Sequence, residues 1–365
     1  MSIGISDIIS GIGSLDRAAM ALAEDRQARL AKPPHSLGRL EDISVKLAGI
    51  TGKLYCDLDR RRVLIFASDN GIVREGVSSA PQSVTLSQTV NFTRGLTGVA
   101  VLARHFHAEL DVIDVGIDAG SVCPGVRDQK IARGTRDFAR EPAMSRHEAL
   151  RAMMVGRETA LRAASDGMDV IGVGEMGIGN TTTSSAVLSA LLGLPAAGTV
   201  NRGAGINDDA YARKMRLIDE AIGRWKPDPD DPVDVISKVG GFDIAAMCGA
   251  FLGAASARLP VVIDGFISAV AALCAWRLEP LSADYMFPSH ASREQGYRRA
   301  MDAMGMRPML ELDMRLGEGS GCPIAFEIMA AAERVIREMG TFEEAAIDDS
   351  YLDEIRAEKR YTGEA

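Results

Sequence analysis

Two glutamates that stand between glycines are the residues of this chain best suited to chemistry. Glu175 lies in the segment 170–182, VIGVGEMGIGNTT, and Glu318 lies in the segment 314–321, MRLGEGSG. Glycine turns let the backbone bend tightly and let a ligand approach closely. A carboxylate inside such a turn can face a ligand, whereas the alternatives are a structural turn with a capped helix for the first segment and an exposed loop acid for the second.

The first segment also predicts an anion site. Residues 169–173 are apolar and β-branched, which indicates a buried strand, and a helix is expected to run on to Leu192. Backbone N–H groups at the start of a helix bind phosphate. The spacing matches neither a Walker A loop nor the dinucleotide-binding fingerprint. The phosphate-binding residues predicted from this turn are Gly177, Gly179, Asn180, Thr181 and Thr182.

Alternating strand and helix patterns must position these turns. Strands are expected at residues 63–67, 110–116, 169–173, 260–265 and 283–287, and helices include 85–105, 207–224 and 243–258. This alternation predicts an α/β fold with a mostly parallel, doubly wound sheet. Ligands of such sheets bind beyond the carboxyl ends of the strands. Polar and glycine residues gather at those predicted ends, as in Asp69-Asn70-Gly71 and Asp264-Gly265.

Composition excludes several classes of protein. The 365 residues carry a formal net charge of −9 with no basic block, which argues against a nucleic-acid partner. No apolar stretch is long enough to span a membrane and no signal peptide is evident. The five cysteines lack metal or redox spacing, which indicates reduced thiols in a cytoplasmic protein. The five histidines show no metal-ligand spacing either, so no metal site is expected.

Both glutamate segments resemble signatures of a known family, the nicotinate-nucleotide:dimethylbenzimidazole phosphoribosyltransferases. These enzymes act in the assembly of the lower ligand of cobalamin. The resemblance continues in the segments 33–41 (PPHSLGRLE), 138–144 (FAREPAM), 240–246 (GGFDIAA), 264–267 (DGFI) and 289–292 (SHAS). It therefore covers nearly the whole chain.

This resemblance implies a Rossmann-like sheet domain over residues 60–335 and a small helical domain built from residues 1–59 and 336–365. It also implies a homodimer that uses no cofactor. The implied reaction is displacement of nicotinate from C1′ of nicotinate mononucleotide by 5,6-dimethylbenzimidazole, which gives α-ribazole 5′-phosphate. The leaving pyridinium loses its positive charge and needs no metal, while nearby carboxylates stabilise an oxocarbenium-like transition state.

The matched motifs imply roles for individual residues. Glu318 matches the family's catalytic glutamate and suits the general base that takes a proton from the attacking azole, while Glu175 matches a second acid near the ribose. The implied nucleotide-side residues are Arg202, Gly203, Lys214, His290 and Ser292. The implied base-binding residues are Asn70, Ser78, Ala80, Gln82, Met314 and Leu316.

Departures from the family's pattern concern the base pocket most. Asn70, Ala80, Ala204 and Tyr297 stand where the family often has His, an aromatic residue, Thr and His. Loss of an aromatic wall weakens stacking on a flat base, so another benzimidazole, a purine or a phenolic is the alternative acceptor. A non-catalytic nucleotide sensor is the alternative of a different class, although phosphate binding alone gains nothing from two nearby carboxylates.

Overall fold

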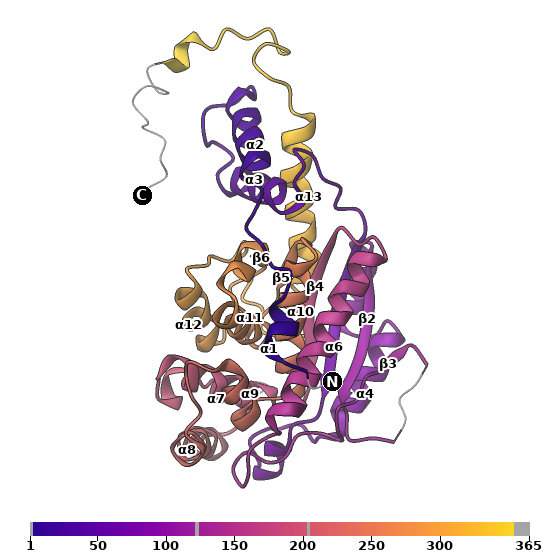
Figure 1. Ribbon diagram of the computed structural model, residues 1–365, viewed down its shortest axis with the longest axis vertical. Helices are drawn as coiled ribbons and strands as arrows, with labels where there is room; N and C mark the ends of the chain where they lie inside the picture. Colours follow the sequence, from indigo (N-terminus) through magenta and orange to yellow (C-terminus); the bar gives the residue numbers. More distant parts are fainter. Residues whose placement is uncertain (1–2, 121–123, 203–204, 354–365) are drawn as a thin grey trace. The chain divides into compact units, whose positions relative to one another are not determined.

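The computed structural model (Figure 1) describes residues 3–120, 124–202 and 205–353. Contacts within the chain divide it into two compact units. A sheet unit comprises residues 3–13 and 61–325, and a helical unit comprises residues 14–60 with the described residues from 326 on. The predicted division placed residues 3–13 in the helical domain and residues 326–335 in the sheet domain. In the structure, residues 3–13 belong to the sheet unit and residues 326–335 to the helical unit.

Six parallel strands form the centre of the sheet unit as described, in the order β3-β2-β1-β4-β5-β6. This is the Rossmann strand order, and it reverses between β1 and β4. The predicted α/β fold with a doubly wound parallel sheet is therefore confirmed. The strands are β1 (Arg61–Ser68), β2 (Ala108–Gly116), β3 (Val126–Asp128), β4 (Val170–Met176), β5 (Val261–Ile263) and β6 (Met286–Pro288).

Helices surround this sheet. Because β1 to β2 and β4 to β5 step in opposite directions, right-handed crossovers put their connecting helices on opposite faces. α10 packs on β1, β2 and β4 and also contacts α6, which lies in front of the sheet in Figure 1. The helices of this unit are α1 (Ile5–Ile9), α4 (Ser83–Thr93), α5 (Gly98–His105), α6 (Arg146–Ser165), α7 (Asn180–Leu192), α8 (Asp208–Trp225), α9 (Pro232–Val239), α10 (Phe242–Ser256), α11 (Phe266–Leu278) and α12 (Gln295–Met304).

Glycines allow α6 and α10 to pack with their backbones in contact. A Cβ at Gly156 would lie 1.7 Å from the carbonyl oxygen of Ala246, and one at Gly249 would lie 1.8 Å from that of Met153. No side chain fits in such a space, so the contact requires glycine. This close packing holds α10 firmly against the strands that end at the site.

Three predicted elements differ from the structure. The strand expected at residues 169–173 runs on to Met176, so Glu175 lies in β4 and the turn begins only at Gly177. The single helix expected at 85–105 is two helices, α4 and α5, separated around Gly95, whose φ of 71° favours glycine. The last strand begins at Met286 instead of residue 283, and the short edge strand β3 was not predicted.

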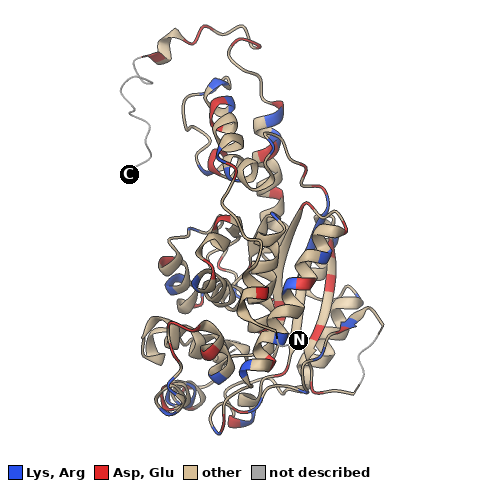
Figure 2. Ribbon diagram, viewed as in Figure 1, with Lys and Arg blue, Asp and Glu red and all other residues tan. Residues whose placement is uncertain are grey.

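The helical unit contains α2 (Arg17–Arg29), α3 (Arg39–Thr51) and most of α13 (Cys322–Glu338), within which the boundary between the units falls. Ala19, Ala23, Ala48 and Ile336 form its small core. Figure 2 shows charged residues of both signs interspersed over the outer helices. None of the helices in the described ranges combines the length and apolar character needed to cross a bilayer.

Candidate active site

A cavity of about 1240 Å³ opens in the sheet unit, beyond the carboxyl ends of the strands at the point where strand order reverses. Its wall comes from segments far apart in the sequence, including residues 77–80, 175–181, 265–267 and 315–318, with side chains of α8. Doubly wound sheets bind their ligands at this place. Both glutamates singled out in the sequence line the cavity.

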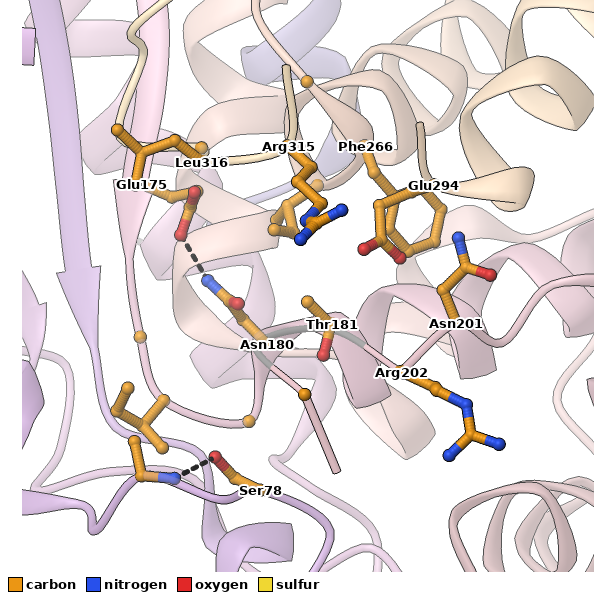
Figure 3. A pocket seen from close by; sticks show the side chains of 18 of the residues that line it. Ser78, Glu175, Asn180, Thr181, Asn201, Arg202, Phe266, Glu294, Arg315 and Leu316 are labelled. Carbon is orange, nitrogen blue, oxygen red and sulfur yellow. Dashed lines mark hydrogen bonds between the residues drawn. The ribbon is translucent and has the colours of Figure 1, made fainter. Parts of the chain in front are cut away.

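Glu175 is held at the end of β4 by donors from two directions. The Asn180 side-chain amide, in the first turn of α7, donates to its Oε2 (Figure 3), and the Glu318 backbone N–H donates to its Oε1 over 3.2 Å. Burial, reinforced by the Asp243 carboxyl, raises the pKa of Glu175 to about 8. A pKa of about 8 favours the protonated form of Glu175 at neutral pH.

Glu318 is also held by two neutral donors, which come from α4 and α5. Gln88 Nε2 of α4 donates to its Oε1 over 2.7 Å, and the Val99 backbone N–H of α5 donates to its Oε2 over 3.3 Å. The break between α4 and α5 brings both donors to the same carboxylate. The side chain is thus oriented, yet it lies on the cavity wall. A carboxylate in this position can accept a proton from a bound molecule.

The Glu318 loop has an unusual backbone that explains its glycines. Gly317, Glu318 and Gly319 have φ values of 83°, 64° and 86°, all in the left-handed region. Such a conformation is costly for glutamate and natural for glycine. Asp264, just after β5, stabilises the turn because its carboxylate accepts from the N–H groups of Gly319 (3.0 Å) and Gly321 (2.7 Å).

The two glutamate segments touch directly. A Cβ on Gly174 would come within 2.6 Å of the Glu318 carbonyl oxygen and the Gly319 nitrogen, and one on Gly317 would come within 2.5 Å of Glu175 Oε1. These glycines therefore allow the loop to lie against the end of β4. The sequence predicts two glycine turns, and the structure joins them into one wall.

The predicted phosphate turn lines the cavity in part. Gly177, Gly179, Asn180 and Thr181 are on its wall, whereas Thr182 is fully buried behind it. The backbone N–H groups of alternate residues already donate within the protein: that of Asn180 to the Gly177 carbonyl (3.0 Å) and that of Thr182 to the Gly179 carbonyl (2.8 Å). The Asn180 side chain donates to the buried acids Glu175 and Asp243, and its part in phosphate binding stays a prediction.

Lys214 places a buried positive charge on the cavity wall. Its Nζ donates to Thr181 Oγ1 over 2.9 Å and to the Asn201 carbonyl over 3.4 Å. No carboxylate of the described residues lies within ion-pair distance of it. Burial lowers its pKa to about 8, an effect that Glu294 opposes. A buried ammonium without an ion pair provides a strong site for an anionic group.

Further polar groups surround the Lys214 side of the cavity. Arg202 pairs with Asp208 and lies 4.9 Å above the ring of Tyr211. Arg315 and Glu294 project into the same region (Figure 3). Burial raises the pKa of Glu294, and its Oε2 lacks a hydrogen-bond partner in the described part of the chain. The region thus offers cations for a phosphate and an acceptor for a hydroxyl.

The other predicted nucleotide-side residues are placed as follows. Ser292 and His290 line the cavity, and His290 is buried with its Nδ1 3.0 Å from Ser289 Oγ. The His290 ring stacks on Tyr297 at a centroid distance of 6.5 Å. Gly203 lies outside the described residues.

The predicted base-binding residues divide into two groups. Ser78, Ala80 and Leu316 line the cavity, and the exposed Leu316 side chain gives it an apolar edge. Three residues are not on the wall. Asn70 is buried behind the turn, the Gln82 amide points toward Asp118 at 3.5 Å, and Met314 contributes a carbonyl oxygen that accepts from the Arg293 N–H.

Several residues that shape the site were not predicted as site residues. Gln88, Asp243, Asp264 and Glu294 hold or flank the two glutamates and Lys214. The position of Asp264 after a predicted strand was a usable signal. Gln88 gave no signal, because its role depends on how α4 packs against the distant Glu318 loop. Within the described residues, no group of three or more His, Cys, Asp or Glu side chains is placed to hold a metal ion.

Comparison with known proteins adds an independent finding. A family model described as phosphoribosyltransferase matches residues 12–347. The nicotinate-nucleotide–dimethylbenzimidazole phosphoribosyltransferase of Clostridium perfringens is 50% identical over 357 residues, which cover 98% of this chain and 99% of the relative. The protein of the same name from Ruminiclostridium cellulolyticum is also 50% identical, covering 94% of this chain and 97% of its own length.

A solved crystal structure is also similar to this chain. The crystal structure of the nicotinate-nucleotide–dimethylbenzimidazole phosphoribosyltransferase of Thermus thermophilus matches with a TM-score of 0.87 and 38% sequence identity. The match covers 92% of this chain and all of that one.

Proposed function

Because the chain belongs to the nicotinate-nucleotide–dimethylbenzimidazole phosphoribosyltransferase family, we propose that it transfers the phosphoribosyl group of nicotinate mononucleotide to a benzimidazole-type base. The products are α-ribazole 5′-phosphate, for dimethylbenzimidazole, and nicotinate. One observation supports this best: the oriented carboxylate of Glu318, the acid of Glu175 and the buried cation of Lys214 share one cavity. That set suits a nucleotide with a phosphate at one end and a reacting C1′ at the other.

Glu318 acts as the general base in this proposal. When an azole nitrogen attacks C1′, the ring becomes cationic unless its other nitrogen gives up a proton. Gln88 and Val99 hold the Glu318 carboxylate on the cavity wall, where it can accept that proton. The apolar edge at Leu316 and the small Ala80 leave room for a flat bicyclic ring.

Lys214, Thr181 and the turn residues Gly177 and Gly179 bind the 5′-phosphate in this proposal. The phosphate supplies the counter-charge that the buried Lys214 ammonium lacks among its described neighbours, and a charge-assisted hydrogen bond forms between them. Glu175 is hydrogen-bonded both to Asn180 of the phosphate turn and to the Glu318 backbone, and in this proposal it stands beside C1′, where its carboxylate stabilises the cationic transition state.

The activity is tested by incubating the purified protein with nicotinate mononucleotide and dimethylbenzimidazole and measuring released nicotinate by chromatography. We expect release that depends on the base. Absence of any release with dimethylbenzimidazole, other benzimidazoles, purines and phenols would contradict the proposal and favour the sensor alternative.

The phosphate site has a sharper test. Lys214→Met is compared with the wild type on nicotinate mononucleotide and on nicotinate riboside, which lacks the phosphate. We expect the variant to lose at least tenfold in kcat/KM on the nucleotide, about 1.4 kcal/mol, and little on the riboside. Equal losses on both substrates would show that Lys214 supports the fold or the chemistry instead of the phosphate.

We also propose a homodimer in the cytoplasm. The family resemblance and the unpatterned cysteines support these two proposals, and the exposed apolar side chains of Leu96, Val101 and Leu316 suit contact with a second copy. Light scattering of the eluted protein is expected to give twice the chain mass.

A further inference from the structure

Glu175 is linked through Asn180 to a second acid, Asp243, that the reaction described above does not use. The Asn180 Nδ2 group donates one hydrogen to Glu175 Oε2 and the other to Asp243 Oδ2 over 3.2 Å. Asp243 lies in the first turn of α10 and is fully buried. It is not on the cavity wall, so Glu175 is the member of the pair that a ligand reaches.

Among the described residues, the groups that shift the pKa values of this pair are acidic or neutral, while Arg315 lines the same cavity. Asp264 approaches Glu175 from the end of β5, and the Glu318 loop contributes its backbone N–H together with a further carboxylate that points to Gln88. On the other side, Asn70 and Asp243 both lie against Gly177, where a Cβ would come 3.0 Å from each of them.

Two buried carboxylates that share one neutral donor repel each other unless one is protonated. Burial raises the pKa of both acids, to about 8 for Glu175 and about 6 for Asp243. Both shifts favour a state in which the pair holds one proton.

We propose that Asp243 is a positioning residue that acts through Asn180 to keep Glu175 protonated in the empty cavity, and that the pair releases this proton to solvent when a cationic pyridinium ring enters. This inference rests on the proposed function, because nicotinate mononucleotide brings the cation. The positive ring favours the ionised form of the acid beside it. The cavity thus stays neutral near Glu175 while it is empty and becomes negative where the transition state needs negative charge.

The proposal is tested by calorimetric titration with nicotinate mononucleotide at pH 7 in buffers of different ionisation enthalpy, which reports the protons released on binding. The proteins compared are the wild type, Asp243→Asn, Glu175→Gln and the control Glu109→Gln. Glu109 is an exposed residue that forms an ion pair with Arg62. Lys214 takes up protons when it binds a phosphate, and it does so in the wild type and in every variant. The differences in proton release between the proteins therefore report on Glu175 and Asp243.

We expect the wild type and Glu109→Gln to release about one proton more than Glu175→Gln, which cannot titrate. Asp243→Asn keeps an acceptor for Asn180 yet removes the charge, so its release falls below that of the wild type. The acidic limb of its pH profile for kcat/KM also moves down by about one pH unit, a shift that a purely structural role does not produce.

Binding with the same proton release in the wild type and Glu175→Gln would overturn the proposal, even if Asp243→Asn failed to fold. Equal release and equal pH profiles in the wild type and a folded Asp243→Asn would overturn the role of Asp243. If none of the proteins bound the nucleotide, the proposed function itself would be wrong. Binding without proton release would instead contradict only the inference about Glu175 and Asp243.

Discussion

Glu175 and Glu318 look alike in the sequence and line the same cavity, but the structure surrounds them with different groups. Glu175 ends a central strand, is enclosed by other acids and has its pKa raised to about 8. Glu318 stands in a left-handed loop and is held by the neutral donors Gln88 and Val99. Burial and neighbouring acids thus raise the pKa of Glu175, whereas the Glu318 side chain is oriented on the cavity wall by donors from two helices.

This difference comes from the elements that deliver each side chain. β4 carries Glu175 into the buried end of the sheet, where Asp243 and Asp264 also arrive from neighbouring elements. The loop that carries Glu318 instead lies over β4 and turns its side chain toward α4 and α5. The groups that surround each acid therefore depend on the topology of the sheet unit more than on the local sequence.

The largest expected effect is on the acid assigned as base. Glu318→Gln keeps the shape of the side chain and one acceptor oxygen, but it replaces the other oxygen by an NH2 group and cannot accept a proton. Turnover at neutral pH is expected to fall by roughly 10²–10⁴, measured as nicotinate release. Glu311→Gln, an exposed position a few residues before the loop, serves as the control. Near wild-type turnover in Glu318→Gln would show that Glu318 is not the general base.

A second test uses the pH dependence of stability. In the folded protein Glu175 stays neutral up to about pH 8, whereas in the unfolded chain a carboxyl ionises above about 4.5. Between these values the folded state binds more protons, so the free energy of unfolding falls as pH rises. Glu175→Gln removes this fall and is expected to gain up to about 4 kcal/mol relative to the wild type between pH 5 and 8.5.

Denaturant unfolding at both pH values measures this difference. A stability difference between Glu175→Gln and the wild type that does not change with pH would show that Glu175 is not a proton holder in the folded protein.

The contact between the two segments is tested with Gly174→Ala. Its Cβ meets the backbone of Glu318 and Gly319 at 2.6 Å, and backbone cannot move as a flexible side chain can. We expect a loss of about 1–3 kcal/mol in unfolding free energy, with a fall in activity. Gly223→Ala in α8 is the matched control, because a Cβ there meets no atom within 4 Å, and it should be neutral or up to about 1 kcal/mol more stable.

A smaller effect is expected on the selectivity among the acceptor bases that bind next to Glu318. Ala80 lines the cavity without an aromatic wall, so we expect dimethylbenzimidazole and at least one other benzimidazole or purine to be used within about tenfold in kcat/KM, roughly 1.4 kcal/mol. Ala80→Tyr restores a stacking surface worth on the order of 1 kcal/mol and sharpens the preference for dimethylbenzimidazole. Competition between bases measures both. A thousandfold preference in the wild type would contradict the open-pocket argument.

Removal of metal ions is expected to have no effect on activity. Neither glutamate needs a metal to perform its proposed role, so excess EDTA should leave nicotinate release unchanged. Loss of activity that a divalent ion restores would mean that the two acids share a cation, and the distinction between them would then need a different explanation.

Much of the fold could be predicted from the chain alone. Apolar, β-branched runs followed by glycine and polar residues located four strands that the structure contains, and the alternation with helices gave the parallel sheet. The helix that begins after Asn207 was predicted from its cap, and the Asn207 side chain does accept from the Ala210 N–H over 2.9 Å. These features are local, so short stretches of sequence determine them.

The candidate site was predictable only in outline. Glu175, Glu318, Thr181 and Lys214 could be named from motifs and family resemblance, and all four line one cavity. Asn70, Gln82 and Met314 were expected on its wall and are not there. Their motifs lie beside the cavity in the chain, but side-chain direction depends on how the flanking loops turn.

The sequence by itself determined the residue types, the strand and helix pattern and the glycines that permit close backbone contact. Tertiary structure decided that the pKa of Glu175 is raised, because burial and neighbouring charge set a pKa and both arise from distant segments. Asp243 and Asn180 are 63 positions apart, and Gln88 and Glu318 are 230 apart, yet each pair shares a hydrogen bond. No local pattern encodes such a pair, since only the packing of the sheet and its helices brings them together.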